Sequence, residues 1–144
     1  MNDQIIVQLG DLDSSDPMED RPSLSNVVTE SYDPNAFESI VVYLSSGDDR
    51  LLVDLDTEHP ITAYGGQDDD VMISQGSAVV FYGEQGADTL QGSHRNDLLD
   101  AGEGADHAIG GGGNDQIRID SLEDRADGGD QYDQLIWVGP AIPF

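Results

Sequence analysis

Gly110–Arg118 reads GGGGNDQIR, and Gly83–Gln91, which reads GEQGADTLQ, has the same order of small, acidic and apolar residues. Blocks of nine residues with this order follow one another without a gap from Gly65 to Ile136. The sixth place of the eight blocks holds Asp70, Val79, Asp88, Asp97, Asp106, Asp115, Asp124 and Asp133. The eighth place holds Met72, Phe81, Leu90, Leu99, Ala108, Ile117, Ala126 and Leu135. A period kept over so many blocks predicts a solenoid of stacked repeats.

The seventh to ninth places of each block predict a short strand, because side chains alternate across a strand and only the eighth would point inward. Glycine at the first, second and fourth places permits the tight turns that would join these strands. Two blocks then make one coil of eighteen residues, so loops two blocks apart stack on the same edge. One edge would carry the loops of Asp70, Asp88, Asp106 and Asp124. The other edge would carry the degenerate block 74–82 (SQGSAVVFY), then the loops of Asp97, Asp115 and Asp133.

These loops offer hard oxygen ligands. Tight glycine turns can point backbone carbonyl oxygens inward, and the aspartate at the sixth place adds a carboxylate. Calcium takes about 6–8 oxygen ligands at about 2.3–2.6 Å, whereas magnesium prefers a tighter octahedron and keeps its water. The pattern therefore predicts several calcium ions as the cofactor.

The blocks resemble the RTX (repeats-in-toxin) family, whose hemolysin-type repeat has the consensus GGxGxDxUx, where U is a large apolar residue. The resemblance covers Gly65 to Ile136, which is half of the chain. It implies an all-β fold: a parallel β-roll, or right-handed β-helix solenoid, with calcium ions between stacked GGxGxD-type loops. It also implies the ligands of each ion. The earlier loop would supply its aspartate and the carbonyls of its second and fourth places, and the later loop its aspartate and the carbonyls of its first and third places.

Carried over to this sequence, the resemblance implies five ion positions. The first pairs Gly111, Gly113 and Asp115 with Gly128, Asp130 and Asp133. The second pairs Gly66, Asp68 and Asp70 with Gly83, Gln85 and Asp88. The third pairs Glu84, Gly86 and Asp88 with Ala101, Glu103 and Asp106. The fourth pairs Ser93, Arg95 and Asp97 with Gly110, Gly112 and Asp115. The fifth pairs Gly102, Gly104 and Asp106 with Ile119, Ser121 and Asp124.

Three departures from the consensus affect particular loops. Val79 replaces an aspartate and should weaken any ion between the second and fourth blocks. Arg95 and Asn96 replace the small fourth and fifth residues of their loop. The loop of Asp124 has no glycine, which predicts a deformed turn.

Residues 1–43 are predicted to form an acidic N-terminal segment with capping strands. Ile5–Leu9 and Ile40–Leu44 are rich in β-branched residues and predict strands. Asp11–Pro34 between them is acidic and interrupted by proline, which predicts a loop or a disordered stretch.

Three further segments complete the predicted division of the chain. Residues 44–64 are predicted to form degenerate, calcium-poor rungs, in which Asp49 and Leu51 occupy the sixth and eighth places of a partial repeat. Residues 65–136 are predicted to form the RTX β-roll, and residues 137–144 a short C-terminal cap. In that cap, Trp137 and Phe144 are expected to cover the last coil.

Composition excludes several partners. The formal net charge is −25, with five arginines and no lysine, so no basic patch is available for nucleic acid or for an anionic membrane surface. No stretch is long and apolar enough to insert into a membrane as a helix. There is no cysteine, which excludes disulfides and thiolate zinc sites. Composition alone would also suit a disordered acidic chain, but the regular order of the residues argues against disorder.

An enzyme is the first alternative, and we predict that the chain is not one. The histidines are His59, His94 and His107, and none belongs to an HExxH zinc motif. The sequence has no GxSxG elbow and no phosphate loop ending in Gly-Lys-Ser/Thr. Paired carboxylates of the glycosidase type are not excluded by number, but metal ligation explains their regular spacing better.

The predicted function is that of a calcium-binding RTX β-roll module whose folding is driven by calcium. The resemblance implies a secreted, extracellular bacterial protein, with the type I secretion machinery as a partner if the chain is full length. The N-terminus lacks the pattern of a signal peptide, which suits cytoplasmic residence, export by a route that ignores the N-terminus, or excision from a larger protein. The eight residues after the last repeat suit either an excised module or an unusually compact secretion signal. The alternatives are an adhesive or ligand-binding β-solenoid and a non-catalytic accessory domain of a secreted enzyme. An uncovered last coil would favour self-association through the C-terminal end.

Overall fold

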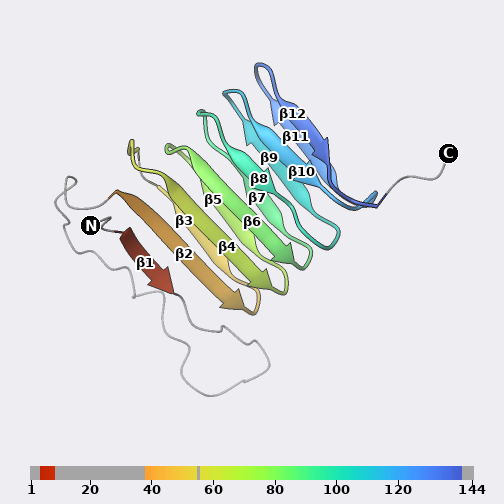
Figure 1. Cartoon of the computed structure of the whole chain (residues 1–144), viewed down its shortest axis with the longest axis horizontal. Coiled ribbons are helices and arrows are strands. Elements are labelled where there is room, and N and C mark those ends of the chain that lie inside the picture. Colours follow the sequence, from red (N-terminus) through yellow and green to blue (C-terminus); the bar gives the residue numbers. More distant parts are fainter. Residues whose placement is uncertain (1–3, 9–37, 55, 141–144) are drawn as a thin grey trace.

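The computed structural model describes residues 4–8, 38–54 and 56–140, which form a solenoid of parallel strands (Figure 1). One sheet contains, in spatial order, β1 (Gln4–Gln8), β2 (Ser39–Ser46), β4 (Ile61–Gln67), β6 (Val79–Gln85), β8 (Leu98–Asp100), β10 (Gln116–Ile119) and β12 (Gln134–Trp137). The other contains β11 (Arg125–Gly129), β9 (His107–Gly111), β7 (Thr89–Gln91), β5 (Val71–Ser74) and β3 (Arg50–Val53). These ranges contain no helix, and hence no helical membrane span. The predicted all-β parallel solenoid is confirmed.

The strand register confirms that two blocks of nine make one coil. In the five-stranded sheet, Val71 pairs with Thr89 and Thr89 with His107, which are steps of eighteen residues. The step is longer at the N-terminal end, where Arg50 pairs with Val71 and Ile40 with Ile61. Both of these steps are 21 residues and both include the connection between β3 and β4. Three extra residues in that connection therefore explain why the nine-residue count breaks upstream of Gly65.

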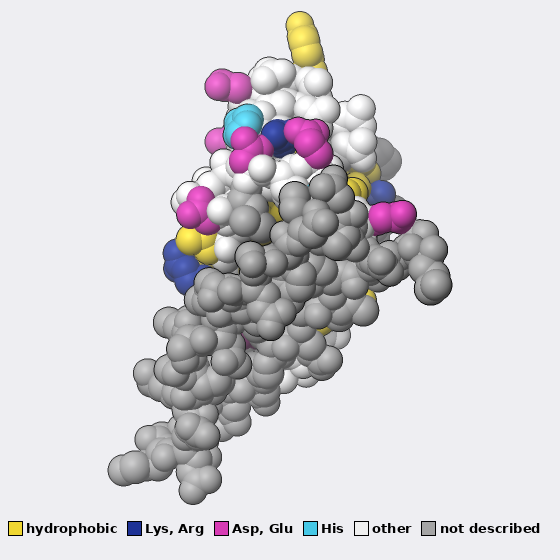
Figure 2. All heavy atoms as spheres, turned by 90° about the vertical axis from the view of Figure 1, so that its left-hand side faces the viewer, with side chains coloured by type: hydrophobic (Ala, Val, Ile, Leu, Met, Phe, Trp, Pro, Cys, Tyr) yellow, Lys and Arg dark blue, Asp and Glu magenta, His cyan; other side chains and the backbone are white. Residues whose placement is uncertain are grey.

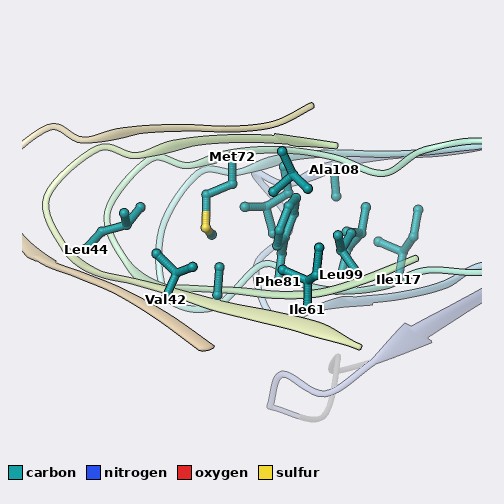
Figure 3. Packing of buried hydrophobic residues seen from close by; sticks show 12 residues of the cluster. Val42, Leu44, Ile61, Met72, Phe81, Leu99, Ala108 and Ile117 are labelled. Atoms are coloured by element: carbon teal, nitrogen blue, oxygen red, sulfur yellow. The ribbon is translucent and has the colours of Figure 1, made fainter. Parts of the chain in front are cut away.

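The eighth-place side chains meet between the two sheets. Phe81, Leu90 and Leu99 have no exposed surface, and Met72 is equally buried. Figure 3 shows Met72 and Ala108 entering the core from one layer, opposite Phe81, Leu99 and Ile117 from the other. In the last coil the inward position is open: Leu135 is 61% exposed, and no rung among the described residues follows it.

The flanking strands belong to the same solenoid. The predicted strands near residues 5–9 and 40–44 are present as β1 and β2, which pair in parallel. On the outer side of the seven-stranded sheet, Tyr43, Tyr64 and Tyr82 stack, with ring centroids 5.0 and 4.9 Å apart. The predicted loop at 11–34 lies outside the described residues, as does Phe144 of the predicted cap.

The backbone ladder between β10 and β12 continues into the described part of the C-terminal tail. The amide of Val138 donates to the Ile119 carbonyl (2.9 Å), and the indole Nε1 of Trp137 donates to the Pro140 carbonyl (3.0 Å). The indole of Trp137 is thus bonded within the tail, and its role as a cap over the last coil stays a prediction. The division into four segments stays a prediction.

Candidate metal centre

The sixth-place aspartates form two ladders, one along each edge of the solenoid. The backbone amide of each sixth residue donates to Oδ1 of the aspartate eighteen residues later. On one edge these bonds join Asp70 to Asp88 (2.8 Å), Asp88 to Asp106 (2.8 Å) and Asp106 to Asp124 (3.1 Å). On the other they join Val79 to Asp97 (2.7 Å), Asp97 to Asp115 (2.8 Å) and Asp115 to Asp133 (2.9 Å). The two predicted edges of stacked loops are thus present.

The loops fall into two conformational classes. In the first class, the second and fourth residues both have positive φ; in loop 110–115, for example, φ is 105° at Gly111 and 106° at Gly113. Six loops belong to this class: 44–49, 65–70, 83–88, 101–106, 110–115 and 128–133. The loops 74–79, 92–97 and 119–124 have no residue with positive φ. We call the first class left-handed loops and the second class closed loops.

In four left-handed loops, the aspartate keeps one buried oxygen outside any hydrogen bond. These atoms are the Oδ2 oxygens of Asp70, Asp88, Asp106 and Asp115. Burial raises the pKa of Asp70 and of Asp106 to about 7 and that of Asp88 to about 6. Burial also raises the pKa of Asp115. A buried polar atom without a partner is costly, so these four oxygens are where a cation would be most favourable.

In the two closed loops that contain an aspartate at the sixth place, the second carboxylate oxygen is already bonded within its own loop. Oδ2 of Asp97 accepts from the amide of Ser93 (2.6 Å) and from its hydroxyl (3.3 Å). Oδ2 of Asp124 accepts from the amides of Asp120 (3.2 Å) and Ser121 (2.9 Å). These two aspartates therefore have less to offer a metal ion.

Backbone carbonyls face the space between stacked left-handed loops. A Cβ built on Gly86 would lie 1.9 Å from the Asp68 carbonyl oxygen, and one built on Gly104 would lie 1.6 Å from that of Gly86. The fourth-place carbonyl of one loop therefore points at the fourth residue of the next. From the opposite side, the first-place carbonyl of Gly83 points back at Gly65 (2.6 Å from a built Cβ). Each carbonyl oxygen has two lone pairs, so a hydrogen bond to one leaves the other available.

This donor set fits calcium. Within the described ranges, no three acidic or histidine side chains come close enough together to hold a metal by themselves. Two carboxylates supplemented by carbonyls are a hard, all-oxygen set of the kind that calcium accepts, with about 6–8 ligands. Structural zinc sites are built mainly from Cys and His, and the left-handed loops contain neither residue.

The predicted ligand residues are brought together to different extents. The first three predicted pairs each stack two left-handed loops: 110–115 with 128–133, 65–70 with 83–88, and 83–88 with 101–106. The fourth and fifth pairs each combine a left-handed loop with a closed one, namely 92–97 with 110–115 and 101–106 with 119–124. The deformed turn predicted at Asp124 is present as a closed loop.

Sequence reasoning missed one loop as a ligand source. Loop 44–49 stacks on loop 65–70: the amide of Asp49 donates to Oδ1 of Asp70 (2.8 Å), and the Ser45 carbonyl oxygen lies 2.0 Å from a Cβ built on Gly66. Its φ values are 94° at Ser45 and 96° at Gly47, as in the other left-handed loops. The signal was the partial repeat around Asp49, which the three-residue insertion puts out of phase with the later blocks.

Comparison with family models matches residues 82–117 to the RTX calcium-binding nonapeptide repeat, in four copies. Comparison with curated proteins and with solved structures found no match. The matched residues include loops of both edges and the buried aspartates Asp88, Asp106 and Asp115. The chain is therefore a parallel β-solenoid whose residues 82–117 match the RTX calcium-binding nonapeptide repeat.

Proposed function

We propose that calcium binds between stacked left-handed loops and that this binding drives the folding of the chain. The observation that carries the proposal is the set of buried Oδ2 atoms without a hydrogen-bond partner, at Asp70, Asp88, Asp106 and Asp115. Bound calcium would supply positive charge to these carboxylates and hold adjoining loops together. The net charge of −25 opposes compaction when no cation is bound. Because the loops stack only in the folded chain, calcium affinity adds to the free energy of folding.

We place the strongest ion positions where two left-handed loops are consecutive on one edge. Three lie on the first edge: 44–49 with 65–70, 65–70 with 83–88, and 83–88 with 101–106. One lies on the second edge, between 110–115 and 128–133. The two edges thus offer four strong positions. The positions that involve Asp97 and Asp124 should be weaker, because the second oxygen of each is bonded within its own loop.

The wider role proposed is that of a non-catalytic folding module of a secreted bacterial protein, exported by a type I system. RTX repeats are typical of secreted proteins, which supports this part of the proposal. In this role the solenoid is structural and calcium-binding, its regular carboxylates serve as ligands, and it binds no nucleic acid and inserts into no membrane.

A calcium titration followed by far-ultraviolet circular dichroism tests the folding proposal. We expect a steep transition from coil to β structure, with magnesium at equal concentration doing much less. Isothermal titration calorimetry should count about four strong ions, one for each consecutive pair of left-handed loops. A β-rich spectrum that excess chelator leaves unchanged would show that calcium does not drive folding.

A further inference from the structure

Loop 74–79, which ends at Val79, and loop 92–97 are stacked on the second edge, and a positively charged side chain of the protein joins them. Arg95 extends from loop 92–97 across two earlier connections of the same edge. Its Nε donates to the Gly76 carbonyl (2.9 Å), its Nη2 to Oδ1 of Asp56 (2.5 Å) and its Nη1 to Oε1 of Glu58 (3.3 Å). One side chain thereby joins loop 92–97 to loop 74–79 and to the connection between β3 and β4. Figure 2 shows, on the described part of one face, basic side chains among acidic ones.

The space between loops 74–79 and 92–97 lacks the oxygen ligands that calcium would need. The sixth residue of loop 74–79 is Val79, which is buried in the core. Asp97 is the remaining carboxylate, and both of its oxygens are used: Oδ1 by the amide of Val79 (2.7 Å) and Oδ2 by Ser93 (2.6 Å from its amide). Both loops are closed loops. The nearby cavity of about 440 Å³ is lined in part by apolar residues that include Ile61, Val79 and Leu98.

A guanidinium is suited to replace an ion here. It has five donors in a planar fork and stays charged at any physiological pH, so it can bond several acceptors on different loops at once. The acceptors at this position are one backbone carbonyl and two carboxylates, the same types of oxygen that the left-handed loops present. The two carboxylates lie on the connection that has three extra residues, which is why they reach over loop 74–79.

We propose that the Arg95 guanidinium takes the place of calcium between loops 74–79 and 92–97, so that these two loops are held together without a metal ion. The inference deepens the proposed calcium function, since it states which interloop position excludes calcium and why. The Nε atom of Arg95 is bonded to Gly76, and the guanidinium pairs with both Asp56 and Glu58, two carboxylates that would otherwise repel each other.

The first test is hydrogen–deuterium exchange in saturating calcium. Arg95→Met keeps an apolar stem and removes the charge and the donors. We expect amide exchange in residues 56–60 and 74–79 to rise at least about tenfold, with loops 101–106 and 110–115 unchanged. Arg118→Met is the matched control, because Arg118 also pairs with a carboxylate, Asp100 (3.3 Å), but within one sheet. If Arg95→Met and Arg118→Met leave residues 56–60 equally protected, the bridging role is wrong.

The second test asks for a calcium site in place of the arginine. In the double variant Val79→Asp, Arg95→Gly, the loops regain the carboxylate and the small fourth residue of the repeat. Calorimetry should count one calcium ion more than in the unmodified chain, and Arg95→Met alone should leave the count unchanged. A double variant that folds in calcium but gains no ion would overturn the substitution. If the unmodified chain binds no calcium, the proposed function fails, whereas the exchange result still decides whether Arg95 bridges the loops.

Discussion

Acidification should fold this chain partially without calcium. The reason lies in the aspartates of the ladder, whose pKa is raised to about 7 at Asp70 and Asp106 and to about 6 at Asp88 because folding buries them. A pKa raised in the folded state means that the folded chain binds protons more tightly than the unfolded chain. Between about pH 4 and about pH 7, the stability of the calcium-free fold therefore increases as the pH falls.

The size of the effect follows from the shifts. A carboxyl whose pKa rises from 3.8 to about 7 costs the folded chain about 4 kcal/mol above pH 7, at about 1.36 kcal/mol per pKa unit. Asp70, Asp88 and Asp106 each add such a cost, and because part of it is their mutual repulsion, the joint cost is smaller than the sum of three separate costs but still large beside the ~5–15 kcal/mol stability of a typical domain. Calcium-free chain should thus be unfolded at about pH 8 and gain β structure at about pH 5, where ordinary carboxyls are still ionised.

The assay is circular dichroism in chelator across this pH range, above the sequence pI of about 4.1 to avoid precipitation. Asp88→Asn removes one buried charge and should shift the transition to higher pH. Asp127→Asn, at an exposed ninth place, is the matched control and should not shift it. In calcium the dependence should reverse, because protons compete with the metal for carboxylates. Identical spectra at both pH values in chelator would refute the reasoning.

Three further predictions concern the ladder, the turns and the tail. Asp115→Ala should raise the calcium concentration at which half of the chain is folded more than Asp133→Ala does, because Asp115 lies between two rungs of its ladder and Asp133 lies on the last. Equal midpoints in titrations followed by circular dichroism would contradict the stacked-loop assignment. Gly104→Ala should destabilise calcium-loaded protein by about 2 kcal/mol or more in urea unfolding, since its Cβ would meet the Gly86 carbonyl at a φ of 151°. Gly112→Ala should cost much less, as its nearest contact would be 3.4 Å. Truncation after Ile136 should lower folding cooperativity or provoke association in light scattering, because it shortens the last strand, β12, which carries the exposed Leu135. A truncated chain that stays monomeric and folds at the same calcium concentration would assign the tail another role.

The linear order of residues was enough to predict the coil and its two edges. A period of nine with an apolar eighth place places Leu90 over Ala108 and Met72, because a parallel register simply repeats the period. It also places Asp88 over Asp106 on one edge and Asp97 over Asp115 on the other. These are consequences of local spacing, so they can be read without knowing any contact in advance.

The state of each loop depends on contacts that spacing does not encode. Asp97 and Asp106 occupy the same place of their blocks, yet Oδ2 of Asp97 is bonded to Ser93 and Oδ2 of Asp106 has no hydrogen-bond partner. The difference arises because the φ values of the loop decide whether its own amides can reach the carboxylate. The bridge from Arg95 to Asp56 joins residues 39 apart and requires the longer connection between β3 and β4. Periodicity specifies which residues stack, whereas the turn conformation and the inserted residues specify which oxygens remain for a metal ion.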